Sequence, residues 1–187
     1  MFVIERRAFV LGAFALVAAG GARAEDVWGE FRRGDALALM RHATAPGTGD
    51  PPDFRLGDCS TQRNLSDEGR AQARRIGENI RRNGIERAAV YSSQWCRCLD
   101  TARALDLGEA REQPLLNSFF GKPGQSDARS RETLAWIRTL RRAAPTVLVT
   151  HQVNITALTG VFPASGEIIF VSPGQNTMAV RGRMTLG

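Results

Sequence analysis

Two short apolar runs constrain the fold of this chain more than any other feature, because each leads into one of its only two histidines. Residues 36–40 precede Arg41 and His42, and residues 146–150 precede His151. Apolar runs of this length are typical of central strands in a parallel sheet. In open α/β sheets, ligands bind just beyond the carboxyl ends of such strands. The sequence therefore predicts that both imidazoles lie in one crevice at one edge of a sheet.

Strands and helices alternate along the rest of the chain. The clearest helix begins at Ser66, a good N-cap residue, carries an apolar stripe and stops at Asn83-Gly84. Further helices are expected over residues 95–105, 126–143 and from 152, strands over 88–91 and 112–116, and an edge hairpin over 168–171 and 177–181. The alternation predicts an α/β three-layer sandwich with a mostly parallel central sheet and helices on both faces.

A polar loop over residues 44–64 is unusually long for a compact domain. It is rich in Gly, Pro and Asp. Because it follows directly on the first histidine strand, we expect it to act as a functional flap.

The first residues carry the pattern of an export signal. An arginine pair precedes an apolar stretch, and residues 22–24 supply a small-x-small cleavage pattern. We expect residues 1–24 to be removed, leaving residues 25–187 as a single domain in the periplasm or outside the cell, with no stable membrane insertion. A retained anchor is the alternative, although the stretch is short for a bilayer. Residues 5–11 also resemble a twin-arginine signal.

The formal net charge is +6, and Lys122 is the only lysine. The arginines are interspersed with acids, as in residues 70–82, and form no stripe with stacking aromatics. This pattern argues against nucleic acid as a partner. The oligomeric state is left open by the sequence.

Three cysteines would meet an oxidising compartment after export: Cys59, Cys96 and Cys98. One disulfide with one leftover thiol is expected, joining Cys59 to either of the other two. The cysteines and histidines show no zinc-binding spacing, so no metal is expected.

The chemistry-bearing residues fall at one predicted sheet edge: Arg41-His42, the turn from Ser92 to Arg97, and His151. Two guanidinium groups and two imidazoles would form a cationic pocket suited to a phosphoryl group. Four segments here resemble the histidine phosphatase superfamily, which has the phosphoglycerate mutase fold; they are residues 39–43, 64–73, 91–102 and 149–151.

The resemblance implies that His42 is a nucleophile that takes the phosphoryl group and is then freed by water. Arg41, Arg97 and His151 would bind the phosphoryl oxygens, and no cofactor is implied. The expected function is an exported phosphatase acting on a small phosphomonoester or activated phosphate. The alternative is a phosphate-recognising protein without turnover. Thr44, Arg63 and Gln152 are weaker candidates for the site, and Ser92 is expected to shape the turn rather than touch substrate.

The sequence departs from the family at the proton donor. Asn117 and Gln152 stand where members carry an acidic residue. The long loop is expected to supply the acid instead, with Asp58 favoured over Asp53. Otherwise the leaving group departs unassisted, or turnover has been lost. A phosphosugar mutase is disfavoured because the chain has no obvious insertion to hold a reorienting intermediate.

Overall fold

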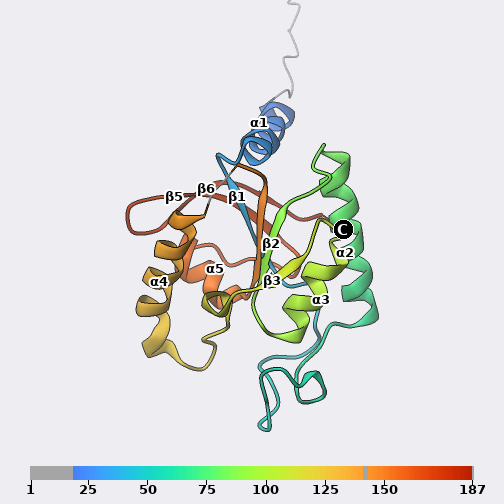
Figure 1. Ribbon diagram of the computed structural model, residues 1–187, viewed down its shortest axis with the longest axis vertical. Helices are drawn as coiled ribbons and strands as arrows, with labels where there is room; N and C mark the ends of the chain where they lie inside the picture. The colour runs from blue at the N-terminus through green and yellow to red at the C-terminus, as the bar shows by residue number, and fades with distance from the viewer. Residues whose placement is uncertain (1–18, 141–142, 187) are drawn as a thin grey trace, which may run out of the picture.

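A computed structural model of the protein describes residues 19–140 and 143–186. Its centre is a six-stranded sheet with the order β3-β2-β4-β1-β5-β6 (Figure 1). The first four strands in this order are parallel to one another, and β5 runs antiparallel to both of its neighbours, β1 and β6. The strands are β1 (Leu37–Arg41), β2 (Ala89–Ser92), β3 (Ala110–Glu112), β4 (Thr146–Thr150), β5 (Ile168–Pro173) and β6 (Met178–Met184).

Helices cover both faces of the sheet, so the predicted three-layer α/β sandwich is confirmed. In Figure 1, α2 and α3 lie on one side of the sheet, and α4 and α5 lie on the other. The helices are α1 (Ala19–Arg33), α2 (Asp67–Arg82), α3 (Cys96–Ala104), α4 (Ser126–Thr139) and α5 (Gln152–Thr159), with short 3-10 turns η1 (Cys59–Thr61), η2 (Pro114–Leu116) and η3 (Pro123–Gln125).

Alternation along β1 divides the core into two layers. Ala38 and Met40 pack in the cluster that contains residues of α1, α2 and α3, whereas Leu37 and Leu39 pack in the cluster that contains residues of α4 and α5. All four side chains are fully buried. Burial on both faces explains why this strand is an unbroken apolar run rather than an alternating one.

The register of β1 and β4 places the two histidines side by side. Arg41 pairs with Thr150 across these adjacent parallel strands, so His42 and His151 are the next residues on each. The loop of residues 44–64 leaves from the same edge and extends below the sheet in Figure 1.

The predicted helix after the loop is confirmed as α2. The Ser66 hydroxyl accepts the backbone N–H of Gly69 at 3.0 Å and so caps the first turn. At Gly69 an added Cβ would lie 2.0 Å from the Thr44 carbonyl oxygen. Only glycine lets the start of α2 approach the chain that follows His42 so closely.

Three elements differ from the sequence-based expectation. The strand expected over 112–116 is wrong: β3 ends at Glu112, and Pro114, which has no N–H for a ladder, begins η2. The helix expected to reach residue 143 ends at Thr139. In the expected edge hairpin, β5 is interior because it also pairs with β1, which leaves only β6 at the edge.

Helix α1 has no counterpart in the sequence-based prediction. Its side chains Trp28 and Phe31 are buried against Phe170, with ring centroids 5.0 and 5.4 Å apart. Residues 1–18 of the expected export signal lie outside the described residues, and residues 19–24 belong to this helix. Cleavage after Ala24 stays a prediction. Among the described residues, no helix combines the length and apolar character that crossing a membrane requires.

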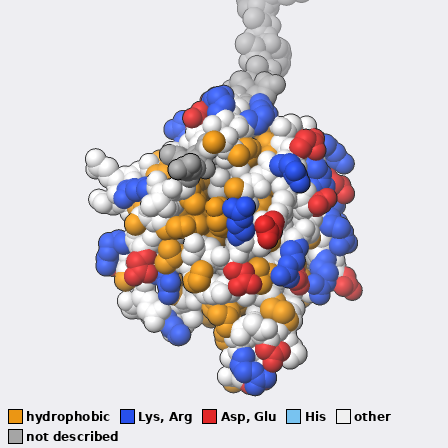
Figure 2. Space-filling view, viewed as in Figure 1, with side chains coloured by type: hydrophobic (Ala, Val, Ile, Leu, Met, Phe, Trp, Pro, Cys, Tyr) orange, Lys and Arg blue, Asp and Glu red, His pale blue; other side chains and the backbone are white. Residues whose placement is uncertain are grey.

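Charges of both signs are mixed on the surface. On the face shown in Figure 2, Lys and Arg side chains alternate with Asp and Glu side chains and form no continuous basic stripe. Exposed ion pairs such as Arg75 with Glu68 account for part of this mixing.

Candidate active site

The carboxyl ends of β1, β2 and β4 surround a pocket of about 380 Å³. His42 and His151 meet there, with ring centroids 5.6 Å apart. The turn from β2 into α3 brings in Arg97, which is 3% exposed. The pocket is lined by Arg41, His42, Gly47, Thr48, Gly49, Asp50, Arg63, Arg97, Ser118, Phe120, His151, Gln152, Val153 and Phe162. The structure thus brings together the four residues that the sequence placed at this edge.

His42 is held as a neutral imidazole with a free nitrogen. Its Nδ1 lies 2.8 Å from the Ala43 carbonyl oxygen, and because a carbonyl only accepts, Nδ1 carries the proton and Nε2 the lone pair. Burial has the largest effect and lowers the pKa of His42 to about 3; the Ala43 bond, second in size, opposes it, and the charges of Arg97, Arg63 and Arg41 add to the lowering. At neutral pH the ring is therefore uncharged, with one proton, on Nδ1.

The orientation of His151 is fixed by a chain of hydrogen bonds. The Asn117 Oδ1 accepts the Gln94 backbone N–H at 2.9 Å, which identifies it as the amide oxygen. The Ser93 hydroxyl donates to this oxygen at 3.2 Å, so its own oxygen accepts from His151 Nε2 at 2.8 Å. Burial, followed by the neighbouring His42, keeps the pKa of His151 well below its usual range. Asn117 therefore acts here through Ser93 as an orienting group.

Three arginines line the pocket, and the surrounding loops hold two of them. Arg41 donates to the Pro163 carbonyl at 2.9 Å. Arg63, a weaker candidate from the sequence, donates to the carbonyls of Gly49, at 2.7 Å, and Ala45. Among the described residues, the buried Nε atoms of Arg41 and Arg97 have no hydrogen-bond partner. Unsatisfied buried donors of this kind are rare, and an anion in the pocket would supply acceptors to the guanidinium groups.

Asp50 is the one acidic side chain among the pocket-lining residues of the described chain. Its carboxylate oxygens lie 2.6 and 3.1 Å from the two terminal nitrogens of Arg97, and Trp95 Nε1 donates to it at 3.0 Å. Three guanidinium groups and one carboxylate give the pocket a net positive charge that is equal and opposite to the charge of a phosphate dianion. Sequence reasoning missed Asp50, since nothing local distinguishes it from the other acids of the loop.

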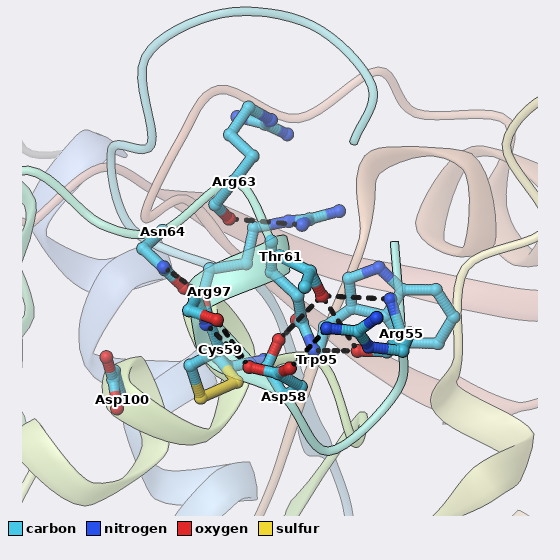
Figure 3. The surroundings of a disulfide bond; sticks show 12 residues. Arg55, Asp58, Cys59, Thr61, Arg63, Asn64, Trp95, Arg97 and Asp100 are labelled. Carbon is cyan, nitrogen blue, oxygen red and sulfur yellow. Dashed lines mark hydrogen bonds and ion pairs between the residues drawn. A yellow bond between two sulfur atoms is a disulfide. The ribbon is translucent and has the colours of Figure 1, made fainter. Parts of the chain in front are cut away.

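Asp58, the predicted proton donor, is not brought into the pocket. Its carboxylate accepts the backbone N–H of Ser60 at 3.1 Å and the guanidinium of Arg55 at 2.9 Å, and so caps η1 (Figure 3). Its side chain is 42% exposed. The hydrogen bonds from Ser60 and Arg55 hold the pKa of Asp58 below its usual range. Asp53 is exposed and also lies outside the pocket lining. The favoured position for the acid is therefore corrected.

The expected disulfide joins Cys59 to Cys96, and Cys98 stays a buried thiol (Figure 3). The bond ties the long loop to the first residue of α3, immediately before Arg97. The Cys98 sulfur lies 3.5 Å from His151 Nε2. Burial raises the pKa of Cys98 to about 12, so it is a packed thiol rather than a thiolate.

The remaining candidates divide between the pocket and its supports. Gln152 lines the pocket. Thr44 does not; its backbone N–H and hydroxyl both donate to Gln72 at 3.0 Å. Ser92 is buried and donates to the Ser93 carbonyl, in line with the predicted role in the turn. Within residues 19–140 and 143–186, no group of three or more His, Cys, Asp or Glu side chains is placed to hold a metal.

Comparison with known proteins agrees with this fold. The model of the histidine phosphatase superfamily (branch 1) matches residues 37–119, a segment that contains Arg41, His42 and Arg97. Over these residues, which are less than half of the chain, the sequence is similar to the histidine phosphatase superfamily. No curated protein matches it in sequence.

Solved structures show the same architecture at low sequence identity. The protein histidine phosphatase SixA complexed with tungstate is 18% identical, with a TM-score of 0.55 over 80% of this chain and 96% of that one. Phosphoserine phosphatase from Entamoeba histolytica, in complex with 3-phosphoglyceric acid, is 14% identical, with a TM-score of 0.59 over 79% of this chain and 95% of that one. At these identities the likeness establishes the fold.

Proposed function

We propose that this protein is a phosphatase that transfers a phosphoryl group to His42 and then to water. The observation that carries the proposal is the free Nε2 of a neutral His42 in a pocket with Arg41, Arg63, Arg97 and His151. A nucleophilic imidazole and a surplus of positive charge are the two requirements for phosphoryl transfer to histidine.

In the first step, the lone pair of His42 Nε2 attacks phosphorus and the bond to the leaving oxygen breaks. The arginines bind the phosphoryl oxygens, whose charge is spread in the transition state. His151, oriented by Ser93, lies beside the same group. In the second step, water attacks phosphorus, and the bond to His42 breaks, which returns the lone pair to Nε2.

The phosphatase proposal includes neither a metal nor an organic cofactor. The three arginines already supply the positive charge that a metal ion provides in other phosphoryl-transfer enzymes. Export is also part of the proposal. It rests on the signal pattern of residues 1–24 and on a disulfide of the kind that persists in oxidising compartments.

The second candidate is a phosphate-binding protein without turnover, which the absence of an acid at Asn117 and Gln152 favours. Purified protein should release inorganic phosphate from p-nitrophenyl phosphate at the same rate with and without EDTA. Binding of phosphate without catalytic release would identify the binding protein instead. A rate abolished by EDTA and restored by a divalent cation would contradict the metal-independent mechanism.

A further inference from the structure

The pocket holds an acid that the family motifs do not mark. Asp50 is held on three sides: its oxygens accept from Arg97, from Trp95 Nε1 at 3.0 Å and from the Arg63 backbone N–H at 3.2 Å. Its side chain is 17% exposed, and it shares the pocket with His42. Asp50 forms an ion pair with the guanidinium of Arg97. An incoming phosphoryl group would bind the same guanidinium.

We propose that Asp50 is the proton donor to the leaving oxygen. The inference rests on the proposed phosphatase function and replaces Asp58 in that role. When a phosphoryl group binds Arg97, it displaces Asp50 from the guanidinium. It also places its own negative charge beside the Asp50 carboxylate. Both changes favour the protonated acid. The released carboxylate still lines the pocket that holds His42, and so it is available to the leaving oxygen.

The proton comes from the substrate. Asp50 is ionised in the empty pocket. Burial, the largest single effect, raises its pKa, but the hydrogen bond and charge of Arg97, with the hydrogen bonds from Trp95 and the Arg63 backbone, together keep the pKa below the usual range. A phosphomonoester has its second pKa near 6, so it enters partly as the monoanion and can pass its proton to Asp50. The other charged or titratable groups facing this pocket are Arg41, His42, Arg63 and His151.

The cycle then balances. His42 Nε2 bonds to phosphorus, the ester P–O bond breaks, and the Asp50 proton goes to the departing oxygen to give the alcohol. Next, water attacks phosphorus and gives one proton to the Asp50 carboxylate. The P–N bond breaks, and phosphate leaves as the monoanion with the Asp50 proton, which restores the ionised carboxylate of the empty pocket. The same carboxyl group serves as acid and then as base, so no further reactant is needed.

The leaving group of the substrate tests this role. An alkoxide needs a proton in the transition state, whereas p-nitrophenolate does not. Asp50→Asn should therefore lower kcat for an alkyl phosphate by about 100-fold or more while changing kcat for p-nitrophenyl phosphate by much less. With the alkyl substrate, kcat/KM of the unmodified protein should fall as pH rises above about 6. Asp100→Asn, on α3 and outside the pocket, is the matched control and should leave both rates unchanged.

Each other outcome overturns the proposal in a recognisable way. An equal fall with both substrates would show that Asp50 only positions Arg97. A lower KM with unchanged kcat would show that it merely competes with phosphate. The selective loss in Asp58→Asn instead would restore the sequence-based assignment. No turnover of either substrate by the unmodified protein would overturn the phosphatase function itself.

An uncharged groove lies next to the phosphate pocket. It has a volume of about 310 Å³ and shares Phe120, Gln152 and Val153 with the pocket. No charged side chain lines this groove. Phe120 and Phe162, at the pocket, are 58% and 69% exposed, although large aromatic side chains are usually buried. The groove is lined by Phe119, Phe120, Gly121, Ser126, Gln152, Val153, Thr156 and Ala157.

We infer that this groove binds the apolar alcohol portion of the substrate, so that the substrate class is a phosphomonoester of an apolar alcohol. Arg41, Arg63 and Arg97 line the phosphate pocket, where Asp50 and the phosphoryl group balance their charge. None lines the groove to bind a carboxylate or a second phosphate. The charge is thus complementary to one phosphoryl group followed by an uncharged chain. The inference needs the phosphate pocket but does not need turnover.

Binding of stable alkylphosphonates tests the groove without catalysis. Affinity measured by calorimetry should rise from methyl- to butylphosphonate by at least about tenfold, since each buried methylene is worth roughly a factor of four. In Phe120→Ala, the ratio of the affinities for butyl- and methylphosphonate should be severalfold smaller. Val180→Ala, another exposed apolar residue on β6, is the control and should keep the full gain.

Two results would overturn the substrate class. One is equal affinity for methyl- and butylphosphonate. The other is tighter binding of 2-carboxyethylphosphonate than of butylphosphonate, which would place a cation in the groove. A full gain in Phe120→Ala would equally contradict the assignment of the groove as the binding surface.

Discussion

His42→Ala should abolish both turnover and the phosphoenzyme. After brief exposure to a phosphorus-labelled substrate and denaturation, the unmodified protein should carry acid-labile, base-stable phosphate, and His42→Ala none. Loss of the nucleophile removes the only route through a phosphohistidine, so kcat should fall by on the order of 10⁴-fold or more, as for nucleophiles of other covalent enzymes. Quench-flow labelling and steady-state phosphate release measure the two effects.

His151→Ala is the companion variant that separates the two histidines. It keeps the nucleophile and removes the imidazole that lies beside His42 in the pocket, so it should still become labelled, with turnover lower by about 100-fold or more because the reacting groups are positioned less well. Because His42 is buried, phosphate binding and the melting curve of His42→Ala serve to show that the pocket still forms. Equal labelling of the unmodified protein and His42→Ala would refute the assignment of the nucleophile.

The parts of the fold that could be predicted from sequence are those whose signals are local. Strands β1 and β4 are buried on both faces and so appear as unbroken apolar runs, and α2 carries its own cap at Ser66. The sequence does not predict helix α1, because its first residues, 19–24, belong to the pattern of an export signal. Its side chains Trp28 and Phe31 are buried only through contact with β5, far along the chain.

The same distinction between local and long-range signals applies to the residues of the site. The positions of His42 and His151 follow from strand ends, because adjacent parallel strands with a fixed register bring the residues after them together. Asp50 and Asp58 could not be ranked in this way, since both belong to a loop without secondary structure at either position. Their places depend on the Cys59–Cys96 bond and on the contacts that Arg63 and Arg97 make with the loop. Those contacts form only in the folded chain.

Arg97→Lys should lower kcat by about 10³-fold or more while leaving the protein folded. Arg97 reaches Asp50 through two nitrogens, a fork geometry that also fits two phosphoryl oxygens and that a lysine cannot reproduce. Single arginines that stabilise phosphoryl-transfer transition states are worth about 10³ to 10⁵ in rate. Phosphate release and the inhibition constant of inorganic phosphate are the measurements: the rate should fall, and the inhibition constant should rise because phosphate binds less tightly.

The matched control for Arg97→Lys is Arg103→Lys on the same helix. The Arg103 side chain is 64% exposed and lies 3.7 Å from Asp100, outside the pocket lining, so its replacement should change neither constant. Lysine keeps the positive charge beside Asp50, so the carboxylate retains a partner and the melting temperature of Arg97→Lys should change little. A rate for Arg97→Lys within tenfold of the unmodified protein would show that charge alone suffices. The bidentate geometry would then have no part in the proposed mechanism.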